Sequence, residues 1–347
     1  MDFSRKQKIF IGLFMGSVLL FVTLSFYFYQ IFFAKNVLVN KQDKILIIPP
    51  DTDYEKLVPY LQKEEYISDL MSFRFVSKVL KYNQKIKAGR YLVKANDNNL
   101  NFVRMLRAGN QYPVKVTFNN VRLKRDLAGK ITRNLLLDSA EFLQKINQPD
   151  FVANYGFDTT SIVSMFLPNT YQMYWTTSVE ELFEKMSKEH KKFWNKKRLD
   201  KAQEIGLEPL KVSVLASIVE AETKKKDEAA RVAGVYINRL RTGELLRADP
   251  TVIFAIGDFS IKRLLFKHLE FDSPYNTYKY AGLPPGLICL PSIHSLDAVL
   301  NYEKHDFIFF CAKEDFSGYH NFAVTYNEHL QNAKRYQAAL DILNIKK

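Results

Sequence analysis

A long apolar segment near the N-terminus constrains the fold of this chain more than any other feature. The run IFIGLFMGSVLLFVTLSFYFYQIFF covers residues 9–33, and Gln30 is its only strongly polar residue. A helix of this length crosses a hydrocarbon layer about 30 Å thick. Helices in the core of a globular domain are usually much shorter. We therefore expect a transmembrane helix at residues 9–33.

The charges beside this segment predict its orientation. Arg5, Lys6 and Lys8 precede it, and the positive-inside rule places such a terminus in the cytoplasm. The apolar run is too long for a cleaved signal peptide, and it lacks a small-x-small cleavage site. We expect residues 1–8 in the cytoplasm, an uncleaved single-pass anchor, and the remainder of the chain outside the cytoplasm.

Composition narrows the function classes. The hydrophobic fraction of 47% excludes a disordered protein, and 347 residues leave room for more than one domain. The formal net charge of +13 favours nucleic acid, anionic lipid or acidic cell-wall polymer as a partner. An extracytoplasmic position argues against nucleic acid. The cysteines, Cys289 and Cys311, suit either a disulfide in an oxidising compartment or two buried thiols.

The chain after the anchor divides into a small module and a larger domain. A β-rich run at residues 45–48 precedes helical patterns, and IKAGRYLV at residues 86–93 returns as a strand. From Pro113 the plan of strand, polar turn and amphipathic helix occurs again. We predict an α+β fold with a small β/α module at residues 44–112 and a larger mixed domain at residues 113–347.

The stretch VSVLASIVEAET carries the strongest chemical signal. Glu220 follows Ala216 by four residues, so it continues the apolar face of the predicted helix. Desolvation there would raise the pKa of the carboxyl, which suits a general acid. On spacing alone, an exposed or arginine-paired glutamate at a fraying helix end is the more common arrangement. Glu222 is rotated by about 200°, and we expect it to face water beside the lysines at residues 224–226.

Three other features are candidates for site residues or caps. The loop SPYNTYKYAGLPPG at residues 273–286 is polar, aromatic and stiffened by prolines; such loops line sites about as often as they merely connect elements. Asp249 and Pro250 are typical of a helix start, with Asp249 as the cap. His320 and His329 lack metal-ligand spacing, and the chain has no HExxH or CxxC motif. We expect neither a metal nor a cofactor.

Six sequence blocks occur in one order over residues 216–329: ASIVEAET, VAGVYINRL, LRADPTVIFA, SPYNTY, GLPPG and HNFAVTYNEH. Each block alone is weak, but the ordered set is specific. With these blocks the chain resembles the endolytic murein transglycosylases, the YceG-like family. KAGRY and the first module resemble, less specifically, the LysM-like subdomain of that family. The resemblance covers nearly the full chain and implies a catalytic domain at residues 113–347.

The resemblance implies a definite reaction. The family cleaves the MurNAc–GlcNAc bond inside nascent peptidoglycan strands without water and leaves a 1,6-anhydro-MurNAc end. Glu220 matches its catalytic residue, which protonates the glycosidic oxygen and then accepts the proton of the attacking C6 hydroxyl. The substrate cleft would be lined or bordered by Tyr275, Asn276, Thr277, Tyr278, Glu222 and His320. Asn276 is the expected donor to the sugar, and Glu222 or His320 would border the cleft or orient Glu220.

The resemblance also implies a location and partners. The chain would be anchored in the bacterial cytoplasmic (inner) membrane, act on peptidoglycan glycan strands and contact peptidoglycan synthases of the elongation machinery. A basic outer surface suits stem-peptide carboxylates and an anionic membrane. The sequence departs from the family pattern after GLPPG. Leu287 stands where proline is common, and Leu290 and Ser292 replace an asparagine and a glycine, which puts the sugar contacts of this loop in doubt.

Two alternatives to the transglycosylase remain. One is a membrane-anchored glycan-binding scaffold without catalysis, in which the LysM-like module binds. The other is a peptidoglycan hydrolase that uses Glu220 with a second carboxylate, Asp249 or Glu222, because ordinary glycoside hydrolysis takes two. Helix geometry disfavours Glu222 as that partner, and capping accounts for Asp249.

Overall fold

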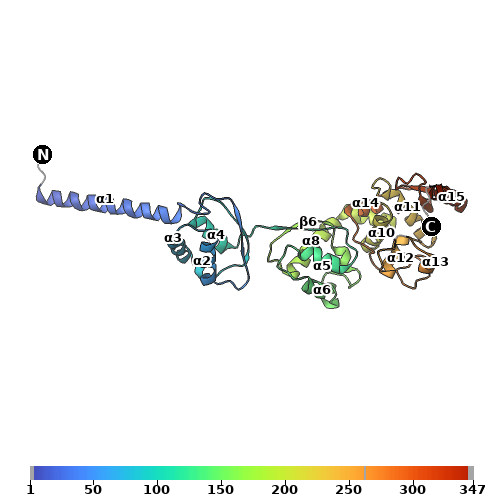
Figure 1. Ribbon diagram of the computed structural model, residues 1–347, viewed down its shortest axis with the longest axis horizontal. Helices are drawn as coiled ribbons and strands as arrows, with labels where there is room; N and C mark the ends of the chain where they lie inside the picture. Colours follow the sequence, from blue (N-terminus) through green and yellow to red (C-terminus); the bar gives the residue numbers. More distant parts are fainter. Residues whose placement is uncertain (1–3, 262, 343–347) are drawn as a thin grey trace. The chain divides into compact units, whose positions relative to one another are not determined.

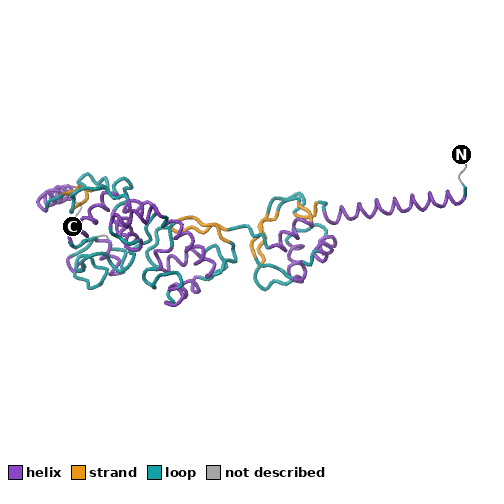
Figure 2. Tube along the Cα trace, turned by 180° about the vertical axis from the view of Figure 1, so that it is seen from behind, coloured by secondary structure: helices purple, strands orange, loops and turns teal. Residues whose placement is uncertain are grey.

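The computed structural model describes residues 4–261 and 263–342 and confirms an α+β fold. Helices predominate, and the strands form two-stranded sheets (Figure 2). The chain divides into two compact units. The first unit comprises Met1–Val114 with Gln172–Thr176, and the second comprises Lys115–Tyr171 with Thr177–Lys347.

The apolar segment forms one long helix, α1 (Arg5–Phe32), which begins with a capping box between Ser4 and Gln7 (Figure 1). Its mean hydropathy reaches 2.4, and it is long and apolar enough to cross a membrane. Phe32 is the only residue of the helix that is buried. The end of α1 is fixed to the first unit, where Asn99 donates to the Ile31 carbonyl at 2.9 Å.

The first unit is built on an antiparallel pair of strands, β2 and β3, with helices between them in sequence. Its elements are β1 (Lys35–Val37), β2 (Lys44–Ile48), α2 (Tyr54–Lys63), α3 (Leu70–Val79), η1 (Tyr82–Gln84), β3 (Gly89–Val93), β4 (Asp97–Asn98) and α4 (Asn99–Ala108). Leu46 pairs with Tyr91 in the register, and both are fully buried. The alternation of strand side chains therefore directs one face of this pair into the core.

The second unit begins with a pair of strands and an aromatic core. Its first elements, with Val114 and residues 172–173 at the strand ends assigned to the first unit, are β5 (Val114–Phe118), α5 (Lys124–Thr132), α6 (Ser139–Ile146), α7 (Pro149–Ala153), η2 (Ile162–Met165), β6 (Asn169–Met173), α8 (Val179–Phe193) and α9 (Lys196–Ile205). Strands β5 and β6 pair. Phe166 packs edge-to-face against Phe142 and Phe183, with ring centroids 5.7 and 5.3 Å away. Phe118, the last residue of β5, also packs on Phe166 with ring centroids 6.3 Å apart, so this core contacts the strand that leads into the β5–α5 loop.

The remaining elements of the second unit surround one buried helix, α10. They are α10 (Pro209–Glu222), α11 (Ala229–Thr242), α12 (Asp249–Ile256), α13 (Phe266–Leu269), α14 (Ile293–Leu300), β7 (Phe309–Ala312), β8 (His320–Ala323) and α15 (Tyr326–Ile342). Every residue of α10 from Val212 to Val219 is buried. Helices α9, α11, α12 and α14 all contact it. From Val212 to Val219 the helix thus has no exposed face, and its last turn carries Glu220 and Glu222.

Candidate active site

The last turn of α10 opens on a cleft of about 620 Å³ within the second unit. Glu220 lies on its wall, and the loop between β5 and α5, helix α12 and residues 288–290 supply the other walls. Phe254 and Ile253 of α12 give the cleft an apolar side, while Arg122 and Lys224 give it a basic one. A cleft with one apolar side and convergent charged groups is typical of a ligand site.

The carboxylate of Glu220 is held through a single oxygen. Its Oε2 accepts hydrogen bonds from the hydroxyls of Ser292 and Ser295, both at 2.6 Å, and from the Ser292 backbone N–H at 3.2 Å. Ser292 is the N-cap of α14, so this helix directs its positive end toward the carboxylate. Among the described residues no donor reaches Oε1. The half-buried side chain therefore has a fixed orientation and one oxygen available to a ligand.

Ile288 and Cys289, which precede these serines, are hydrogen-bonded to α10. The Ile288 backbone N–H donates to the hydroxyl of Ser217 at 3.1 Å, and the Cys289 thiol contacts the Ser217 carbonyl at 3.3 Å. On the other side of this segment, the Leu290 N–H donates to the Val121 carbonyl at 2.7 Å. Leu290, where the family pattern has asparagine, thus contributes a backbone contact to the cleft wall. These bonds bring three distant segments of the chain together.

The two cysteines of the described chain are free thiols. Cys289 lies on the wall of the cleft. Burial raises the pKa of its thiol to about 12, and the nearby charge of Glu220 adds to this effect. A thiol with such a pKa is not a nucleophile at neutral pH. The sequence allowed either a disulfide or two free thiols, and the structure has two free thiols.

Glu222 points away from the cleft into the protein, which corrects the expectation that it faces water. The hydroxyl of Tyr236, on α11, donates to its Oε1 at 2.6 Å. Burial raises the pKa of Glu222 to about 7, although the Tyr236 hydrogen bond acts in the opposite direction. The charge of Asp249 adds to the increase. Glu222 is therefore the carboxyl that the fold desolvates, and it has no hydrogen bond to Glu220 among the described residues.

Asp249 also lies apart from Glu220. The sequence predicted Asp249 as the N-cap of α12. In the structure Asp249 is the first residue of the helix, and the N-cap is Ala248. Its Oδ1 accepts a hydrogen bond from the hydroxyl of Tyr278 at 2.5 Å. Burial and this bond raise the pKa of Tyr278 well above its ordinary value. Tyr278 is thus held in a pair with Asp249.

Asn276 and Thr277 hold the loop from inside. Asn276 is fully buried, and its amide donates to the carbonyls of Leu269 and Phe271 at 2.8 and 2.7 Å. Thr277 is 1% exposed, and its hydroxyl lies 2.8 Å from that of Thr251. Both amide protons of Asn276 are used in these bonds. Asn276 therefore stabilises the loop, and the expectation that it donates to the sugar is corrected.

Tyr275 lies behind the apolar wall of the cleft. Its ring packs on Phe254, with centroids 4.9 Å apart, and Phe254 itself lines the cleft. The backbone passes close to the Tyr275 hydroxyl at Gly286, where an added Cβ would lie 2.8 Å from it. The tyrosine therefore fixes the GLPPG segment and supports Phe254.

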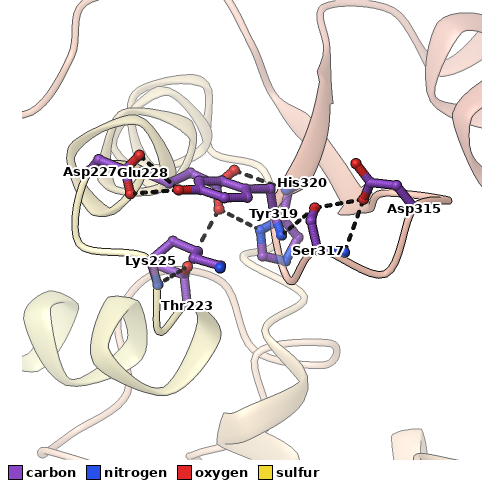
Figure 3. Close-up of polar contacts among 8 residues, drawn as sticks. All are labelled: Thr223, Lys225, Asp227, Glu228, Asp315, Ser317, Tyr319 and His320. Atoms are coloured by element: carbon purple, nitrogen blue, oxygen red, sulfur yellow. Dashed lines mark hydrogen bonds and ion pairs between the residues drawn. The ribbon is translucent and has the colours of Figure 1, made fainter.

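His320 is part of a second cluster, which fastens the segment after α10 to the β7–β8 hairpin (Figure 3). Its Nδ1 is 2.7 Å from Oε2 of Glu228, and its backbone N–H donates to the other oxygen at 2.9 Å. Tyr319 reaches Asp227 at 3.0 Å. Burial alone raises the pKa of Glu228, but the bonds from His320 hold it below its ordinary value. His320 thus positions the segment after α10 and forms no bond to Glu220 among the described residues.

Sequence reasoning missed the groups that contact or face Glu220. Ser292 and Ser295 have the spacing of a helix cap, a signal that could have placed a helix start there. Arg122, Lys224 and Asp126 also line the cleft. The N–H of Leu123 donates to Asp126 at 3.3 Å. Asp126 is the second carboxylate of the cleft, and no spacing relative to Glu220 identifies it.

Comparison with known proteins assigns the chain to a family. The YceG-like family matches residues 46–335. The chain belongs to the YceG-like family. A crystal structure of a YceG-like protein from Listeria monocytogenes is 28% identical, with a TM-score of 0.56 over 84% of this chain and 98% of that one.

Two named relatives extend the comparison of this YceG-like chain. The endolytic murein transglycosylase of Bacillus subtilis (strain 168) is 28% identical over 318 residues, covering 86% of this chain and 87% of the relative. The endolytic murein transglycosylase of Streptococcus pneumoniae (strain ATCC BAA-255 / R6) is 24% identical over 305 residues, or 76% of this chain. The YceG-like chain spans 53% of the pneumococcal relative.

Proposed function

We propose that this chain is a membrane-anchored endolytic peptidoglycan lytic transglycosylase. It cleaves MurNAc–GlcNAc bonds within nascent glycan strands, gives 1,6-anhydro-MurNAc ends and terminates strand elongation. The observation that carries the proposal is Glu220, which lines the cleft with Oε2 fixed by two serine hydroxyls and Oε1 available. The names of the relatives from B. subtilis and S. pneumoniae agree with this activity.

The reaction needs one carboxyl in two protonation states. The proton on Oε1 of Glu220 passes to the glycosidic oxygen, and the bond from that oxygen to C1 of MurNAc breaks with its electron pair on the oxygen. The C6 hydroxyl of the same MurNAc attacks C1, and its proton returns to Glu220. No water is consumed, and the acid is regenerated. The hydroxyls of Ser292 and Ser295 stabilise the carboxylate stage, in which Glu220 is negative.

The arrangement of carboxylates favours this route over hydrolysis. Hydrolysis of a glycosidic bond commonly uses a second carboxylate as nucleophile or base. Glu222 is bonded to Tyr236 and Asp249 to Tyr278, and neither is among the residues that line the cleft. Asp126 does line it, so a hydrolase that uses Glu220 with Asp126 is the second candidate.

The rest of the chain places this activity at the membrane. We propose that α1 is a single-pass anchor in the bacterial cytoplasmic membrane, with the N-terminus inside and the catalytic domain outside. Its length and hydropathy support this topology, as do the lysines and arginine that precede the apolar run. Residues 44–112, which include β2 and β3, are proposed as a LysM-like subdomain that binds glycan, and synthases of the elongation machinery are proposed partners.

Product analysis tests the proposal. The full chain in detergent is incubated with uncrosslinked glycan strands, and its products are compared by mass spectrometry with those of Glu220→Gln. We expect 1,6-anhydro-MurNAc ends from the unmodified chain alone. Reducing MurNAc ends would instead identify the hydrolase. Strands bound but left intact by both proteins would identify the glycan-binding scaffold.

A further inference from the structure

One side of the cleft carries two cations that lack an acidic partner. Arg122 and Lys224 both line the cleft that contains Glu220, and both are exposed. Among the described residues neither forms an ion pair with a carboxylate. Arg125, in the first turn of α5, lies 3.9 Å from its neighbour Asp126. The cleft therefore keeps two positive charges available for a ligand.

Both cations are positioned without being neutralised. The guanidinium of Arg122 lies over the ring of Phe259, 4.8 Å from its centroid, and Phe259 also lines the cleft. Stacking on an aromatic face orients the planar group and leaves its N–H edges free for an anion. The ammonium of Lys224 donates to the backbone carbonyl of Glu220 at 3.1 Å. This contact keeps Lys224 beside the end of α10 and leaves its other protons available.

The two charges act on the same part of the cleft wall. Cys289 lies on that wall, and the charges of Lys224 and Arg122 both lower the pKa of its thiol, while that of Glu220 raises it. Lys224 and Arg122 come from segments about a hundred residues apart in sequence. The fold therefore brings both cations close to one point, near the proposed acid.

We propose that Arg122 and Lys224 bind a carboxylate of the stem peptide carried by the glycan strand, and so make the enzyme prefer peptide-bearing strands. The inference rests on the proposed function. The sugar rings of the strand are neutral, whereas stem peptides carry carboxylates. A guanidinium edge binds a carboxylate through paired hydrogen bonds, and an ammonium adds a further charged donor. A peptide on the MurNAc beside the scissile bond would thereby fix the strand in the cleft.

Direct binding tests this inference independently of turnover. The full chain in detergent, with Glu220→Gln, is titrated with two synthetic strands of equal length, one with stem-peptide carboxylates and one with these groups converted to amides. We expect the carboxylate strand to bind about fivefold more tightly, a size that suits exposed charged hydrogen bonds. Adding Arg122→Ala or Lys224→Ala should bring the ratio of the dissociation constants toward one. Arg122→Lys should keep part of the preference.

The control variant is Arg133→Ala, also in the Glu220→Gln chain. Arg133 is exposed in the same unit and does not line the cleft, so this change removes the same charge and should leave the ratio unchanged. Thermal unfolding monitors the fold of every variant. Equal binding of the two strands by the Glu220→Gln chain would overturn the proposal, as would a preference that survives both Arg122→Ala and Lys224→Ala.

A third strand separates the possible sources of the carboxylate. Removal of the stem peptides by an amidase leaves a free lactyl carboxylate on each MurNAc. Tight binding of this strand, lost in Arg122→Ala, would assign the cations to the lactyl group and overturn the stem-peptide proposal. Cleavage by the unmodified chain is scored separately. A chain that prefers the carboxylate strand but cleaves neither strand would refute the proposed activity and support the binding site.

Discussion

The two glutamates at the end of α10 have the same side chain, lie two residues apart and occupy opposite environments. Glu220 lines the cleft, where hydroxyls from α14 hold one of its oxygens. Glu222 is packed on the other side, where Tyr236 of α11 donates to it and burial raises its pKa to about 7. The comparison shows that the packing of other helices against the last turn decides the environment of each carboxyl.

The largest expected effect is the loss of activity in Glu220→Gln, compared with the matched variant Glu222→Gln. In the proposed reaction Glu220→Gln removes the proton that the leaving oxygen requires, and we expect turnover to fall about a thousandfold or more. Glu222→Gln keeps a group able to accept from Tyr236, and we expect most activity to remain. Rates of anhydro-MurNAc formation measure both. Comparable losses in the two variants would mean that the two carboxyls act together.

The expectation that Glu222 faces water was wrong, and the burial of α10 gives the reason. Helical spacing placed Glu220 on an apolar face and Glu222 in water, but α10 is buried on every side from Val212 to Val219. A helix without a polar face has no periodicity from which to read the orientation of its last residues. Tyr236, which donates to Glu222, lies on the next helix, and no local sequence pattern predicts that contact.

Other features were accessible to sequence reasoning. The apolar run predicted α1, because length and hydropathy are local properties. The ordered blocks predicted the family, which the match over residues 46–335 confirms. The loop with Asn276 was harder to interpret, because a polar residue in an aromatic loop suits either a ligand or a buried backbone bond. The carbonyls that Asn276 binds became visible only in the folded loop.

The second prediction concerns stability as a function of pH. Between pH 4.5 and about 7 the unfolded chain releases the proton of Glu222 while the folded chain keeps it. The folded state then binds more protons, so the contribution of Glu222 to stability is fully present below pH 4.5 and falls as pH rises toward 7, by about 3 kcal/mol at most. Denaturant unfolding across this range should show the decline.

Two variants sharpen this pH test. Glu222→Gln cannot ionise, so its stability should lack this part of the decline. Tyr236→Phe removes the hydrogen bond that lowers the pKa of Glu222, and the decline should extend to higher pH. An identical slope in the unmodified chain and in Glu222→Gln would assign the effect to another group.

The third prediction addresses the serines on the Glu220 side. Ser292→Ala and Ser295→Ala each remove a 2.6 Å donor to Oε2, and a hydrogen bond to a charged group contributes about 1.5–3 kcal/mol. We expect each change to lower kcat about tenfold with little change in KM, because the bond stabilises the carboxylate stage of Glu220 and does not contact the sugar. A loss confined to KM would assign the serines to substrate binding.

The smallest expected effect belongs to Asp126, and it separates the two candidate reactions. Asp126 lines the cleft with Glu220 but accepts from the Leu123 backbone at the start of α5, which suits a capping role. If the sugar's own C6 hydroxyl attacks C1, no second carboxylate takes part, and Asp126→Asn should change kcat less than about threefold. A hydrolase would need that carboxylate and lose most of its activity. Because Asn still accepts from the Leu123 N–H, the substitution keeps the cap and removes only the charge, so the rate reports on the reaction rather than on the fold.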